Sequence, residues 1–214
     1  MGGKAKKKAQ RLATAEHRAE RPLLALASTP LIRMLSPAAK AADEPQLLAL
    51  GIGTFALGTV LRRRTMARSG ARMVASHLLA TGIKTALKAG VDRARPTAAA
   101  KGGATLRKGH GTADTARNAF PSGHAAGAVA VAQAAAHEAP GVATPARLAA
   151  GAAGALQVTR GAHYLTDVAA GAAIGWLSER LAGWAVGTAE RYVAQRAARA
   201  DDAGALAEVE AHPS

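Results

Sequence analysis

The sequence predicts an all-α fold, a multi-helix bundle built as one domain. The 214-residue chain is long enough for a single domain with a sizeable core. No segment shows the sustained alternation of apolar and polar residues that is typical of a strand. The apolar stretches are rich in Gly and Ala at four-residue spacing, as in Gly151 and Ala155 or Gly171 and Gly175. Small residues at that spacing let helices pack closely.

Each predicted helix corresponds to an apolar block between polar segments. The blocks cover residues 23–36, 46–61, 70–89, 122–138, 144–160 and 165–188. The first is short and contains Pro30 and Arg33. A Gly/Thr/Lys-rich stretch without periodicity over 97–118 separates the third block from the fourth and predicts a long loop. Pro145 stands near the start of the fifth block, where proline suits a first helical turn.

The small-residue spacing favours an integral membrane protein with five to six transmembrane helices, although several blocks are shorter than a full crossing or interrupted by charges. About 20 residues of helix cross a bilayer. Because Lys and Arg collect on the cytoplasmic side, the basic N-terminal segment and the cluster after Arg62 are expected on one side, with 23–36 as the first crossing. The loops 88–121 and 160–164 then face outward, towards the periplasm, from a multi-pass protein in the cell (inner) membrane. A soluble alanine-rich bundle is the alternative.

Charge and composition divide the chain and limit its partners. We expect a basic disordered tail over 1–22, a membrane-embedded helical domain over 23–188 and a charged tail over 189–214. The net charge of +14 favours an anionic partner. Aromatic residues make up only 3% of the chain and no nucleic-acid recognition motif is present, so we expect a membrane partner and no nucleic acid. Without cysteine, neither a disulfide nor a Cys-ligated zinc site can form.

The first candidate motif is KAGVDRARP, which ends the third apolar block. Lys88 and Arg95 are seven residues apart, two helical turns, so they share a face if the helix continues. Pro96 disfavours helix at Arg95. The stretch predicts two cations at the end of a helix, although such residues are often only interfacial anchors.

The second motif is FPSGH, at the start of the fourth block. Ser122 can cap a helix by accepting from backbone N–H groups. Gly123 allows a ligand to approach the backbone, and the start of a helix binds anions readily. His124 can donate a proton near neutral pH. The alternative is an ordinary serine cap with an incidental histidine.

The third motif is RGAHYLTDVAAG, which opens the last block. His163 and Asp167 are four residues apart. On a helix, such a carboxylate can reach one ring nitrogen, fix the tautomer and leave the other nitrogen as nucleophile or base. Taken alone, the pair is more often a local surface contact.

The order K-x6-RP, PSGH and H-x3-D, each at the end of an apolar block, resembles the type 2 phosphatidic acid phosphatase superfamily. That family includes bacterial acid phosphatases and vanadium haloperoxidases, and the resemblance covers about residues 45–188. The family's third motif reads SR-x5-H-x3-D, whereas this chain has Leu156 and Gln157 in place of Ser and Arg. Arg160, three residues later, is near the same face if the helix continues and can substitute for that arginine.

The resemblance implies a metal-independent phosphatase with no cofactor. His163 would attack phosphorus to form a phosphohistidine, Asp167 would hydrogen-bond its other ring nitrogen, and His124 would protonate the leaving group. The non-bridging phosphate oxygens would be held by a set of cations and helix-start groups: Lys88, Arg95, Ser122, Gly123 and Arg160. Phosphoryl transfer needs positioning and distributed positive charge, which cations and backbone amides can supply.

The expected substrate is a phosphorylated lipid, either a phosphate or a diphosphate, such as phosphatidate, phosphatidylglycerol phosphate or a polyprenyl diphosphate. Two alternatives stay open: a soluble acid phosphatase of the same fold, and a non-catalytic membrane protein that binds phosphorylated lipid, which Gln157 favours. The sequence leaves the oligomeric state open.

Overall fold

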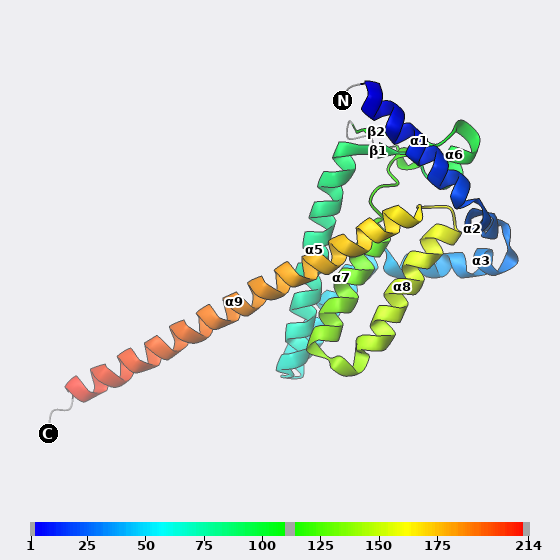
Figure 1. Ribbon diagram of the computed structural model, residues 1–214. Helices are drawn as coiled ribbons and strands as arrows, with labels where there is room; N and C mark the ends of the chain where they lie inside the picture. Colours follow the sequence, from blue (N-terminus) through cyan, green and yellow to red (C-terminus); the bar gives the residue numbers. More distant parts are fainter. Residues whose placement is uncertain (1–2, 110–113, 212–214) are drawn as a thin grey trace.

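The computed structural model describes residues 3–109 and 114–211 and contains a helical bundle (Figure 1). The bundle consists of α4 (Glu44–Val60), α5 (Arg64–Gly90), α7 (Gly123–Glu138), α8 (Ala143–Thr159) and the first part of α9 (Leu165–Ala211). Helix α7 is central, because α5, α8 and α9 pack closely on it and α4 also touches it. Helix α9 continues far beyond the bundle. The all-α prediction is confirmed, and five apolar blocks correspond to these five helices.

Shorter elements surround the bundle. Before it come α1 (Gly3–Ala19), α2 (Arg21–Ala25), the 3₁₀ turns η1 (Leu26–Ser28) and η2 (Ser36–Ala42), and α3 (Pro30–Leu35) between those turns. Between α5 and α7 come β1 (Val91–Arg93), α6 (Pro96–Gly102), β2 (Leu106–Lys108) and η3 (Thr115–Arg117), and η4 (Pro140–Val142) joins α7 to α8. Strands β1 and β2 pair antiparallel. Sequence reasoning missed this hairpin because three-residue strands are too short to show alternation.

Two N-terminal expectations were wrong. The segment 1–22 is not disordered where it is described, because α1 is a helix that contacts β2. The block 23–36 is not one helix, since it is divided among α2, η1 and α3. Its break falls at Thr29, whose extended backbone precedes Pro30. A residue before proline is disfavoured in the helical region, so the chain restarts there with Thr29 as the cap.

The expected membrane topology is not confirmed. Within residues 3–109 and 114–211, none of the helices has both the length and the apolarity that crossing a bilayer requires. The basic segments also lie apart: α1 lies beside the β1–β2 hairpin, which follows the C-terminal end of α5, whereas Arg62 and Arg63 precede its N-terminal end (Figure 1). The placement of the basic residues therefore no longer supports the expected outward orientation of the loops 88–121 and 160–164.

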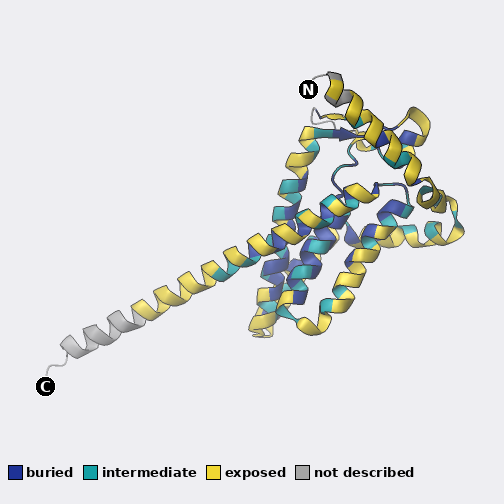
Figure 2. Ribbon diagram, viewed as in Figure 1, coloured by how far each residue is buried: buried dark blue, intermediate teal, exposed yellow. Residues whose placement is uncertain are grey.

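The helices approach one another through small residues. The buried core is mostly alanine, including Ala80, Ala130 and Ala134. Helix α7 is buried over most of its length (Figure 2). Glycines mark the crossings. A Cβ on Gly70 would lie 2.2 Å from the backbone nitrogen of Phe55, so α5 and α4 are in backbone contact there. Glycines therefore set the distance between the helices at these crossings.

This packing predicts opposite effects for two Gly-to-Ala substitutions. Gly53→Ala adds a methyl group where no described atom lies within 4 Å, so better helix propensity should raise the free energy of unfolding by about 0.5–1 kcal/mol. Gly70→Ala forces α4 away from α5 and should lower it by about 1–3 kcal/mol. Denaturant unfolding followed by circular dichroism measures both. A stabilising Gly70→Ala would contradict the close approach.

Candidate active site

Backbone hydrogen bonds draw the three motifs together at one end of the bundle. The N–H of Ala119 donates to the Arg93 carbonyl at 3.1 Å, which joins the first motif to the second. The N–H of Ser122 donates to the Asp167 carbonyl at 3.0 Å, which joins the second to the third. Residues far apart in sequence are thus fixed by main-chain contacts rather than by side chains alone.

A cavity of about 430 Å³ lies at this end of the bundle. Its lining includes predicted site residues from all three motifs, namely Lys88, Arg95, Gly123, His124 and His163. Sequence reasoning missed Lys84, which also lines the cavity and forms an ion pair with Glu44. A Cβ on Gly123 would lie 3.0 Å from the Lys84 side chain, so the start of α7 meets α5 closely at the cavity wall.

His163 is held as a neutral imidazole with one free nitrogen. The ring is 2% exposed, and its Nδ1 lies 2.7 Å from the Ala119 carbonyl. A carbonyl only accepts, so Nδ1 carries the proton and Nε2 keeps its lone pair. Burial lowers the pKa of His163 to about 3, and the charge of Arg95 contributes to the same shift. The ring is therefore available as a nucleophile near neutral pH.

Asp167 lies behind His163 but does not hydrogen-bond to it as expected. Its Oδ2 is 3.9 Å from Nδ1 of His163, which is too long for a hydrogen bond. The carboxylate instead accepts from the Tyr164 N–H at 2.8 Å and from Arg93 Nη1 at 2.6 Å. Burial raises the pKa of Asp167 to about 7, against the effect of Arg93. At this distance the carboxylate can still stabilise positive charge on the ring.

His124 has a carboxylate partner that the sequence analysis missed. Its Nε2 lies 2.7 Å from Oδ1 of Asp43, the residue that precedes the first turn of α4. Asp43 makes no capping hydrogen bond with its side chain, which serves His124 instead. Burial lowers the pKa of His124, and Asp43 opposes that shift. An Asp before the Pro45 helix start reads as an ordinary cap in the sequence, so nothing signalled this pairing.

Asn118 accepts hydrogen bonds from both predicted cations. Lys88 Nζ donates to its backbone carbonyl at 2.8 Å, and Arg95 Nη2 donates to its Oδ1 at 3.2 Å. Burial lowers the pKa of Lys88 to about 8, with Arg95 as the next cause. The Nε of Arg95 is buried and has no hydrogen-bond partner among the described residues. Arg95 thus has donor capacity left for an anion in the cavity.

The other predicted phosphate-binding residues lie outside the lining of this cavity in the described structure. Ser122 is fully buried and caps α7, its Oγ accepting from the Ala125 N–H at 3.4 Å. Arg160 is half-buried at the end of α8. Burial is the main cause that lowers the pKa values of His124 and Arg95, and the charge of Arg160 lowers both further. Arg160 therefore acts electrostatically on the cavity residues.

Gln157, which replaces the family arginine, is buried at 1% exposure. Its Nε2 has no hydrogen-bond partner among the described residues. Its backbone carbonyl accepts from the N–H groups of Ala162 and His163 at 3.0 and 3.2 Å, which ties the third motif to the end of α8. As for metal sites, no group of three or more His, Cys, Asp or Glu side chains able to hold an ion occurs within the described ranges.

Comparisons with known proteins agree with the motifs. The sequence matches the PAP2 superfamily over residues 69–191, more than half of the chain. The structure of LpxE from Aquifex aeolicus has a similar fold, with a TM-score of 0.59 and 21% identity over 77% of this chain and 92% of that chain. No curated protein matches the sequence. The chain belongs to the PAP2 superfamily, as its motifs predict, and is a hydrolase of the phosphatase class.

Proposed function

We propose that the protein is a lipid phosphatase that works through a phosphohistidine on His163. The observation that carries this proposal is the hydrogen bond from His163 Nδ1 to the Ala119 carbonyl at 2.7 Å. It leaves the nucleophilic Nε2 on a ring that lines a cavity with Lys88 and Arg95. A neutral nucleophile beside two cations suits attack on an anionic phosphorus centre.

The reaction has two displacement steps. Nε2 of His163 attacks phosphorus while the bond to the leaving oxygen breaks, and His124 gives its proton to that oxygen. Water then attacks the phosphohistidine, His124 takes its proton, and the P–N bond breaks to release phosphate. Asp167 stabilises the positive charge that His163 carries between these steps.

The anion-binding groups divide into direct and supporting roles. Lys88, Arg95 and the N–H of Gly123 hold the non-bridging oxygens, since all three residues line the cavity. Arg160 adds positive charge from the end of α8. Ser122 fixes the start of α7 through its cap, which keeps the first-turn N–H groups aimed at the phosphate.

A second cavity supports a substrate with an apolar chain. It measures about 570 Å³ and runs between η2, α4, α7 and α8. Its lining is almost entirely aliphatic, and Ala42 lines both this cavity and the active-site cavity. A lipid phosphate can therefore place its head group beside His163 and its chain among the helices. Phosphatidate, phosphatidylglycerol phosphate and a polyprenyl diphosphate all satisfy this arrangement.

Phosphate release from these three lipids in detergent tests the activity, with glycerol phosphate as the chain-free control. We expect the wild type to release phosphate from at least one lipid much faster than from glycerol phosphate. His163→Ala should reduce release to background because the nucleophile is gone. Equal release by the wild type and His163→Ala would exclude the proposed reaction, and faster turnover of glycerol phosphate would favour a soluble acid phosphatase.

Asp43→Asn should lower the pKa of His124, which NMR titration of the ring measures in the wild type and the variant. His124 must be protonated to act as the acid, so activity falls as pH rises through its pKa. Burial, Arg160 and Arg95 lower that pKa, whereas the Asp43 carboxylate raises it. Removing the carboxylate should therefore lower the pKa of His124 and reduce its action as an acid near neutral pH. Glu190→Gln, an exposed change on α9, is the matched control. An unchanged or raised His124 pKa in Asp43→Asn would contradict the pairing.

We further propose that the protein is membrane-bound, with the exposed apolar side chains of its helices in contact with lipid. Large apolar side chains are exposed on three helices: Leu50, Ile52, Phe55 and Leu57 on α4, Leu148 on α8, and Trp176, Leu177, Leu181 and Trp184 on α9. Exposed apolar surface of this extent is typical of membrane or protein contact. The protein should sediment with cell membranes after an alkaline carbonate wash, and its recovery in the supernatant would oppose this placement.

A further inference from the structure

The N-terminal helix contacts the loop that carries the proposed nucleophile. Glu16 accepts from Thr166 Oγ1 at 2.5 Å, and the Glu20 carboxylate accepts from the Leu165 N–H at 3.1 and 3.2 Å. Nδ1 of His17 lies 3.0 Å from the Tyr164 hydroxyl. Three residues of α1 and the turn after it thus bind three consecutive residues that directly follow His163.

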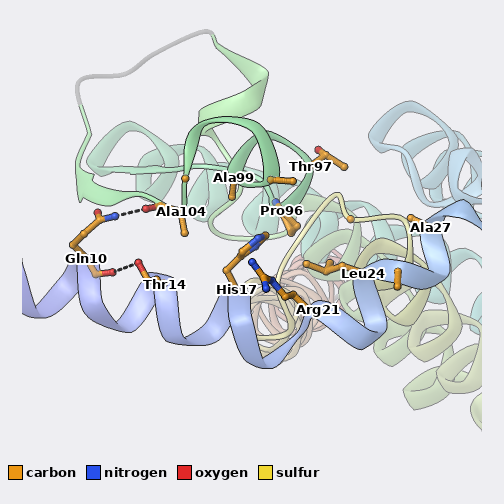
Figure 3. A pocket seen from close by; sticks show the side chains of 14 residues that line it. Gln10, Thr14, His17, Arg21, Leu24, Ala27, Pro96, Thr97, Ala99 and Ala104 are labelled. Carbon is orange, nitrogen blue, oxygen red and sulfur yellow. Dashed lines mark hydrogen bonds between the residues drawn. The ribbon is translucent and has the colours of Figure 1, made fainter.

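The other contacts of α1 hold it in place beside α6 and β2. Gln10 donates to the Ala104 carbonyl, as the dashed line in Figure 3 shows, and Ala13 is buried against Ala94 and Ala99. The inner side of α1 and the start of α2 also face α6 across a cavity of about 580 Å³, into which His17 and Arg21 extend (Figure 3). Helix α1 is therefore docked along more than two turns rather than at its end alone.

Arg93 connects this helix to Asp167. Its Nη1 donates to Asp167 Oδ1 at 2.6 Å and to Thr166 Oγ1 at 2.8 Å, while Nη2 binds the Glu16 carboxylate. The guanidinium also lies 4.4 Å from the centre of the Tyr164 ring. One side chain on β1 therefore joins α1, the loop after His163 and the first turn of α9.

The surroundings of Arg93 differ from those of Arg95. Arg93 is 4% exposed and lies outside the described lining of the active-site cavity. Its charge is instead matched by Glu16 and Asp167. Removing one partner of a buried ion pair leaves the other uncompensated, so these three side chains depend on one another.

We propose that α1 is a positioning element of the active site, in which Glu16 holds Arg93 and Arg93 fixes Asp167 behind the nucleophile. The inference rests on the proposed roles of His163 and Asp167. It assigns a function to a segment that precedes the region matched by the family, residues 69–191. The physical basis is preorganisation, since a displacement of about 1 Å in a catalytic group can cost about 10²-fold in rate.

The charge of Arg93 also has a predictable effect on pH dependence. Asp167 must be ionised to stabilise the ring, so activity is present above its pKa and lost as pH falls through it. Burial and the charge of Glu16 raise that pKa, whereas Arg93 and the Tyr164 N–H lower it. Loss of the guanidinium should therefore move the acid limb of the profile to higher pH.

The test compares kcat, KM and the pH–kcat profile of Arg93→Gln, Arg93→Lys, Glu16→Ala and the double variant Glu16→Ala/Arg93→Gln. We expect Arg93→Gln to lower kcat by about 10- to 10²-fold, to change KM little and to raise the acid limb. Arg93→Lys keeps the charge and should restore the limb towards that of the wild type. Arg18→Gln, on the exposed side of the same helix, should behave like the wild type.

The double variant decides whether Glu16 acts through Arg93. If it does, Glu16→Ala should add little to the loss caused by Arg93→Gln, whereas independent effects would multiply. Multiplied losses, or wild-type kcat in both single variants, would overturn the proposal. Circular dichroism and retained binding of inorganic phosphate check that each variant is folded. If Arg93→Gln does not fold, Arg93→Lys supplies the milder change.

The same series separates this inference from the proposed function. If His163→Ala keeps wild-type activity, the phosphohistidine mechanism fails and the positioning role fails with it. If His163→Ala is inactive while the Glu16 and Arg93 variants match the wild type, the mechanism stands and only the role of α1 is excluded.

Discussion

The active site depends on the backbone contact between α9 and α7. A Cβ on Gly171 would lie 2.4 Å from the Ser122 carbonyl, and a Cβ on Gly175 would lie 2.3 Å from that of Ala126. Only glycine permits this approach. The contact lets the Asp167 carbonyl accept from the Ser122 N–H at 3.0 Å. Because His124 opens α7 and His163 precedes α9, the crossing sets the separation of the two proposed catalytic histidines.

Around this crossing, two neighbouring arginines of the DRARP stretch have different electrostatic environments. Arg93 is matched by Glu16 and Asp167, so its charge is used within the protein. Arg95 donates to Asn118 and keeps a buried Nε without a partner among the described residues, so its charge is available to an anion. The same residue type thus supports the proposed nucleophile at one position and faces the substrate at the other.

The features that sequence could predict are those that arise from local patterns. Apolar blocks gave the bundle helices, and the Ser122 cap follows from side-chain chemistry one turn away. Contacts between distant residues left no such pattern: Asp43 is 81 positions from His124, and Glu16 is 77 from Arg93. The helicity of α1 belongs to this second class, because tertiary contacts through Glu16 and Glu20 dock a segment that looks like a solvated basic tail by composition.

The expected hydrogen bond between His163 and Asp167 failed for a related reason. Spacing of four residues brings side chains together only on a helix. Helix α9 begins at Leu165, so His163 lies in the preceding turn, where its Nδ1 donates to the Ala119 carbonyl. The departure from the family motif at Gln157 lies on the last turn of α8, before this turn. This neutral side chain is 1% exposed, whereas half-buried Arg160 ends α8. A positive charge costs less free energy at position 160 than at position 157. The C-terminal end of a helix favours positive charge, and water still reaches the Arg160 side chain.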